Sequence, residues 1–70
     1  MIDLTKNYYI KKEINDFIKN KKLQKGSIIK FIGYNSNNCY FKVKTANNEN
    51  FLIDEDYLNK IYLEEVKDDN

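Results

Sequence analysis

The chain has 70 residues, the size of one small domain, and it contains no histidine, arginine, tryptophan or proline. Twelve lysines against eleven acidic residues leave a net charge of +1, and 41% of the residues are hydrophobic. This composition excludes histidine-based catalysis and a strongly basic nucleic-acid coat, and the single cysteine excludes an intrachain disulfide. We therefore expect one non-enzymatic domain over residues 1–70, without cofactor or membrane segment, in the cytoplasm.

The N-terminal third has the apolar spacing of an amphipathic helix over about residues 5–25. Ile10, Ile14, Phe17 and Ile18 follow the spacing i, i+4, i+7, i+8, which forms one stripe on a helix. Gly26 comes where a left-handed C-terminal cap is wanted. The sequence predicts a helix here, with its apolar stripe packed on the rest of the domain.

After Gly26 the pattern changes to that of β-strands separated by asparagine-rich turns. The expected strands are rich in β-branched and aromatic residues, and they are short, sequential and tightly connected. We therefore expect an antiparallel meander over about residues 27–66. The first three strands are expected at residues 27–34, 39–45 and 50–53.

Cys39 begins the second of these strands at a position that alternation places inward, with Phe41 and Val43. We expect it to be a small buried hydrophobic residue and not a reactive thiol, because no histidine is available as a base.

The segment 54–67 fits two structures. One is a single helix capped by Asp54, and the other is a turn over residues 54–59 followed by a strand over residues 60–66. We prefer the turn and strand, because this order of elements resembles a small SH3-like β-barrel. The expected fold is thus α+β: an N-terminal helix on an SH3-like meander of three to four strands, with a flexible tail at residues 67–70.

Charge is segregated along the chain, with +7 over residues 1–44 and −6 over residues 45–70. Carboxylates of the second half are suited to a basic surface on another protein, and neighbouring tyrosines are suited to anchor it. Metal binding is not expected, since the acidic cluster lacks the further oxygen ligands and the glycine of a calcium loop. The candidate protein-binding residues on this acidic face are Asp54, Glu55, Asp56, Tyr57, Tyr62, Glu64 and Glu65.

The alternative is a sequence-tolerant nucleic-acid surface on the lysine-rich helix. Lysines neutralise phosphates and tyrosines stack on bases, although the acidic half repels a phosphate backbone. The residues of this alternative are Tyr8, Tyr9, Lys11, Lys12, Lys19, Lys22 and Lys25.

The composition also bears on function, because asparagine, lysine, isoleucine and tyrosine make up more than half of the chain and have AT-rich codons. This bias is typical of a low-GC bacterium, its phages or its mobile elements. A short, lysine- and asparagine-rich chain without catalytic residues is similar in general character to phage-encoded inhibitors of host defence, including anti-CRISPR proteins. We expect a binding protein that occludes or bridges a larger protein or nucleoprotein complex, in the host cytoplasm if phage-encoded. A homodimer that pairs the two charged halves is a third hypothesis.

Overall fold

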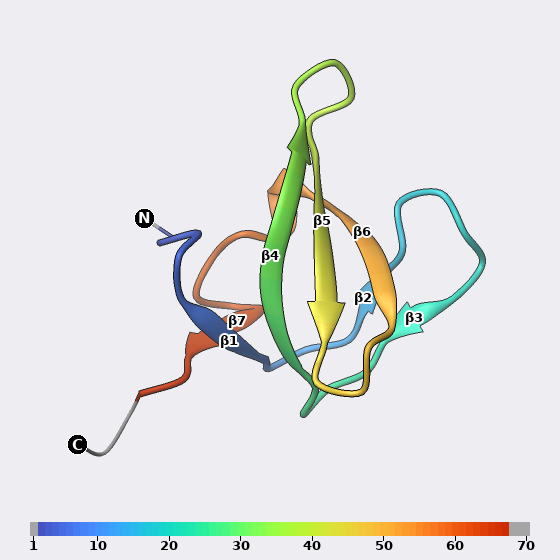
Figure 1. Cartoon of the computed structure of the whole chain (residues 1–70). Coiled ribbons are helices and arrows are strands. Elements are labelled where there is room, and N and C mark those ends of the chain that lie inside the picture. The colour runs from blue at the N-terminus through green and yellow to red at the C-terminus, as the bar shows by residue number, and fades with distance from the viewer. Residues whose placement is uncertain (1, 68–70) are drawn as a thin grey trace.

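The computed structural model describes residues 2–67, which form almost nothing but β-strands and turns (Figure 1). None of the helices in this part of the chain is long and apolar enough to span a bilayer. The expected flexible tail falls outside the described residues except for Lys67. The elements are β1 (Asn7–Ile10), β2 (Ile14–Asn15), β3 (Lys22–Leu23), β4 (Ile28–Asn35), β5 (Tyr40–Thr45), β6 (Asn50–Asp54), the 3₁₀ helix η1 (Glu55–Tyr57) and β7 (Leu63–Glu65).

Five strands make one antiparallel sheet in the order β6-β5-β4-β1-β7, and β2 and β3 form a separate hairpin. The strands β4, β5 and β6 are sequential neighbours joined by short turns. On the other side of β4, β1 pairs with both β4 and β7, so the first and last strands of the chain lie side by side (Figure 1). The β2–β3 hairpin lies beside β6 at the opposite edge of the sheet (Figure 1).

The expected α+β fold, with a helix over residues 5–25 on an SH3-like barrel of three to four strands, is wrong. That segment forms β1, β2 and β3, and the main sheet has five strands. Tyr8, Ile10 and Ile14 are buried, whereas Phe17 and Ile18 of the predicted stripe are 44% and 63% exposed. The residues Asn7-Tyr8-Tyr9-Ile10 alternate exposed and buried, which is the period of a strand. Backbone pairing of β1 with β4 on one side and β7 on the other outweighs the helical spacing.

The core lies between the sheet and the hairpin, and it is made by alternate residues of successive strands. Ile14 and Leu23 face each other across the hairpin and are 0% and 1% exposed. Phe41 and Val43 point inward as the alternation predicts. The buried apolar residues are Tyr8, Ile10, Ile14, Leu23, Ile29, Phe41, Val43, Phe51, Ile53 and Leu63.

Cys39 is exposed, so the prediction that it is buried is wrong. It closes the turn before β5 with a φ of 55°, and this left-handed conformation takes it out of the alternation of the strand. The Asn35 side-chain oxygen holds the turn by accepting hydrogen bonds from the backbone N–H groups of Asn37 (2.9 Å) and Asn38 (3.2 Å).

The C-terminal segment is a turn followed by a strand, so the preferred alternative is confirmed over a single helix. The Asp54 carboxylate accepts a hydrogen bond from the backbone N–H of Asp56 at 2.9 Å and caps η1. The strand is shorter than expected and covers Leu63–Glu65.

Gly26 has a φ of +93°, in the turn between β3 and β4, where its N–H donates to the Ile10 carbonyl at 2.8 Å. A Cβ there would meet no heavy atom within 4 Å, so substitution costs backbone strain alone. We expect Gly26→Ala to lower the free energy of unfolding by about 1–2 kcal/mol in urea titrations. Gly33→Ala is the control: its Cβ would make an ordinary 3.8 Å contact with Lys42. A smaller loss for Gly26→Ala than for Gly33→Ala would contradict this account.

Candidate functional site

A cavity of about 400 Å³ lies between the β2–β3 hairpin and the segment that follows β6. It combines three carboxylates with three aromatic rings, and it has no lysine among its lining residues. We call it the acidic cavity; its lining residues are Asn15, Asp16, Phe17, Asp54, Asp56, Tyr57 and Tyr62.

The tyrosines are placed by the chain reversal after β6. Tyr57 ends η1, and the turn that begins at Asn59 returns the chain so that Tyr62 immediately precedes β7. The Tyr62 carbonyl accepts a hydrogen bond from the Lys11 backbone N–H at 2.7 Å, which ties the turn to the end of β1. The two rings meet edge to face, with centroids 4.8 Å apart. Both tyrosines also pack against the core, so these rings are held in place.

Asp16 fixes the opposite wall of the cavity. One of its carboxylate oxygens accepts hydrogen bonds from the backbone N–H groups of Ile18 (2.9 Å) and Lys19 (2.6 Å), and the other accepts from Leu52 N–H on β6 (2.9 Å). The Phe17 N–H donates to the Leu52 carbonyl at 2.6 Å. The loop after β2 is therefore bound to the edge strand, which satisfies edge groups otherwise open to another chain.

The environment of Asp16 keeps it ionised. Burial by itself would raise the pKa of this carboxyl, but the backbone donors at Lys19, Leu52 and Ile18 and the nearby Lys21 ammonium outweigh that effect. The pKa is lowered below its ordinary value of 3.8. Lys21 also donates to the Asn50 carbonyl and lies 4.2 Å above the Phe51 ring centroid, so it holds the same loop on β6.

The remaining carboxylates leave the cavity negative. The Asp54 carboxylate is used by the cap of η1, whereas the Asp56 side chain is exposed. The Lys12 ammonium, which is not part of the cavity lining, lies 5.6 Å from the Tyr62 ring centroid, so this ring already contacts a cation. The cavity is thus suited to a positively charged group seated against aromatic rings.

The structure brings together only part of the predicted acidic face. Asp54, Asp56, Tyr57 and Tyr62 line the cavity. Glu55 lies on η1 but does not line the cavity. Glu64 and Glu65 are exposed on β7, opposite Tyr9 and Tyr8 of β1.

The sequence analysis missed Asn15, Asp16 and Phe17, because it placed them on a helix. The signal that could have revealed them is the adjacent Asn15-Asp16 pair, which favours a turn with side-chain to backbone hydrogen bonds.

The residues of the nucleic-acid alternative do not share a helix face, because residues 5–25 form strands and loops. Tyr8 is 4% exposed and has no free ring face for a base, while Tyr9 is 41% exposed. The lysines are dispersed over loops and the hairpin. Lys11 donates a hydrogen bond to the Lys60 carbonyl (2.8 Å), and Lys12 contacts the Tyr62 ring. Lys22 forms an ion pair with Glu13 (3.4 Å), while Lys19 and Lys25 are exposed in turns.

Over residues 2–67, no group of three or more cysteine, aspartate or glutamate side chains is arranged to hold a metal ion. No protein-family model matches the chain, and no curated protein or solved structure matches it either.

Proposed function

We propose that this chain is a protein-binding module whose acidic cavity holds an extended, lysine- or arginine-containing segment of a partner protein. The observation that carries the proposal is the pairing of fixed tyrosine rings with carboxylates around one cavity that contains no lysine of its own. Aromatic rings in a groove accept the stem and backbone of an extended segment, and carboxylates at the rim select a cationic end group.

The location of the cavity also supports binding of a partner segment. Tyr57 and Tyr62 are half-buried and lie against the core, so binding would cost little side-chain entropy. Tyrosine is also among the residue types that carry most of the binding energy at protein interfaces. A module of this kind occludes or bridges a larger complex without chemistry of its own; the prediction of a host-defence target rests on composition alone.

The test is selection from a library of random peptides displayed on phage, followed by anisotropy titrations with the selected peptides carrying a fluorophore. We expect selected sequences enriched in lysine and arginine, with affinity that falls as salt rises. The charge reversal Asp56→Lys is expected to weaken binding at least about tenfold.

The matched control is Glu64→Lys, which makes the same charge change on β7 outside the cavity. It should leave binding within about twofold of the unmodified protein, since the exposed Glu64 side chain does not line the cavity. Selection of peptides without basic residues, or equal losses for the two reversals, would reject the proposal. Circular dichroism of each variant establishes that the fold is retained.

A further inference from the structure

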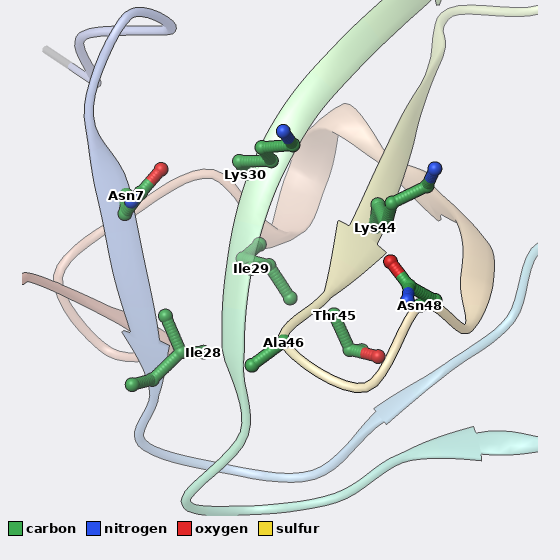
Figure 2. Close-up of a pocket in the computed structure, with 8 residues that line it drawn as sticks. All are labelled: Asn7, Ile28, Ile29, Lys30, Lys44, Thr45, Ala46 and Asn48. Carbon is green, nitrogen blue, oxygen red and sulfur yellow. The ribbon is translucent and has the colours of Figure 1, made fainter.

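The outer face of the main sheet carries two lysines directly opposite each other. Lys30 on β4 and Lys44 on β5 are partners in the strand register, and their side chains lie on the same face (Figure 2). Neighbouring strands are about 5 Å apart, so the two ammonium groups repel each other. Such a pair costs folding free energy.

Nothing on the described chain neutralises the pair. Lys30 and Lys44 line a cavity of about 300 Å³ that has no carboxylate among its lining residues (Figure 2). The one ion pair found within residues 2–67 joins Lys22 to Glu13, away from this face. Each lysine of the pair also has an asparagine opposite it on its other neighbouring strand. Asn7 of β1 pairs with Lys30, and Asn50 of β6 pairs with Lys44. Amide groups beside two unpaired ammonium groups make a surface rich in hydrogen-bond donors.

The same face carries a third lysine and an aromatic ring in line with the pair. Side chains two residues apart on a strand point to the same side, so Tyr40, Lys42 and Lys44 follow one another along β5. Lys42 is exposed. Tyr40 is held in place, because its hydroxyl accepts a hydrogen bond from the Asn35 amide at 3.2 Å and its ring centroid lies 5.2 Å from that of Phe17.

From this arrangement we infer that the outer face of β4 and β5 binds single-stranded nucleic acid, with phosphates at Lys30, Lys42 and Lys44 and a base stacked on Tyr40. Lysines that track a backbone and an aromatic platform in line with them are the two requirements of sequence-tolerant single-strand binding. The mutual repulsion of Lys30 and Lys44 is relieved when a phosphate lies between them.

The lysines of this surface differ from those that the sequence analysis selected, and they do not line the acidic cavity. Tyr40 adjoins that cavity, because it pairs with Asp54 across the strands and its ring contacts Phe17. The lysine set has only Lys30, Lys42 and Lys44, on a strand face and not on a helix. An acidic protein segment would also be attracted by these lysines. The aromatic ring in line with them and the flanking amides favour nucleic acid, because bases use stacking and amide hydrogen bonds as well as charge.

The test is fluorescence anisotropy of labelled thymidine and uridine homopolymers of about 15 nucleotides, titrated with the full chain. With three phosphate contacts, the affinity is expected to fall about 20-fold between about 50 and about 200 mM salt. The double variant Lys30→Glu/Lys44→Glu should weaken binding at least about tenfold. It keeps two like charges opposite each other, so its urea midpoint should be unchanged.

Tyr40→Leu should weaken binding at least about fivefold, through lost stacking. Lys44→Gln should weaken binding and raise the urea midpoint, because it removes the repulsion, and a merely structural lysine would not show this combination.

The matched control is Lys19→Glu/Lys25→Glu, which changes the same number of charges in exposed turns and should leave binding within about twofold.

Absence of binding at about 50 mM salt overturns the inference. Equal losses for the two double variants overturn it as well, since they indicate diffuse attraction. Equal affinity for polyglutamate of matched charge overturns nucleic acid as the ligand and indicates an acidic protein. Lys30 and Lys44 do not line the acidic cavity, so their double variant in the nucleic-acid titration and Asp56→Lys in the peptide titration test the two proposals separately.

Discussion

Replacement of Ile14 by alanine is expected to lower the free energy of unfolding by about 3–4 kcal/mol, a large part of the stability of a chain this short. The Ile14 side chain is completely buried opposite Leu23, where the hairpin closes the core. Truncation leaves a cavity that the rigid sheet cannot fill. The protein therefore loses both the free energy of burying the removed atoms and their van der Waals contacts. Urea unfolding followed by circular dichroism measures the change.

The control is Ile18→Ala, because Ile18 is 63% exposed in the loop after β2. It is expected to change stability by about 0.5 kcal/mol or less. In a helix over residues 5–25 the two isoleucines would share one buried stripe and lose similar amounts. Similar losses for Ile14→Ala and Ile18→Ala would therefore contradict the hairpin.

Replacement of Asp16 by alanine is expected to cost about 3 kcal/mol and to weaken peptide binding in the acidic cavity. The change removes the acceptor of three backbone N–H groups, those of Ile18, Lys19 and Leu52, and hydrogen bonds to a buried carboxylate are stronger than neutral ones. The loop that carries Phe17 then loses its attachment to β6. Urea unfolding and the peptide titration measure the two effects.

Asp3→Ala is the matched control for Asp16→Ala. The Asp3 carboxylate also accepts hydrogen bonds, from the Thr5 N–H and hydroxyl, but it is exposed to water and closes only a local turn. No measurable change in the urea midpoint is expected for it. A loss as large as that of Asp16→Ala would show that attachment of the loop to β6 is not what stabilises the fold.

The pH dependence of stability gives a second test of the contribution of Asp16. Because its folded pKa is lowered below 3.8, the stability that it contributes is present above that value and is lost as pH falls through the folded pKa. The difference in unfolding free energy between the unmodified protein and Asp16→Ala should therefore shrink as the pH is lowered below 3.8. A difference that stays constant through this range would mean that ionised Asp16 is not the stabilising form.

Local sequence was sufficient to predict the three central strands of the sheet. β4, β5 and β6 lie close to the predicted strands, because β-branched and aromatic residues alternate there between asparagine turns that span only a few residues. The segment after Asp54 fitted both a helix and a turn with a strand, and the turn and strand were preferred because the order of elements resembles an SH3-like barrel. Cys39 was misplaced by a single left-handed residue at the start of β5, which alternation alone does not reveal.

Some residues of the candidate site could be chosen from the sequence, and others are brought there only by tertiary contacts. Asp54, Asp56, Tyr57 and Tyr62 were chosen from sequence, since they are close together in the chain and combine acidic and aromatic groups. Asp16, together with its neighbours in the same loop, joins them through contacts with β6, among them the hydrogen bond from Leu52, 36 residues away. The sheet also brings Lys30 and Lys44 together, and neither belonged to a sequence motif.

What the sequence by itself determined is thus the strands β4, β5 and β6, the absence of histidine chemistry and the segregation of charge. What only the tertiary structure decided is the N-terminal third. The positions of Ile10, Ile14, Phe17 and Ile18 fit a helix as well as they fit anything local. The choice was made by distant partners: β4 and β7 supply backbone hydrogen bonds to both edges of β1, and Leu52 supplies the donor for Asp16. Those bonds stabilise strand and hairpin over a helix that would have satisfied only its own backbone.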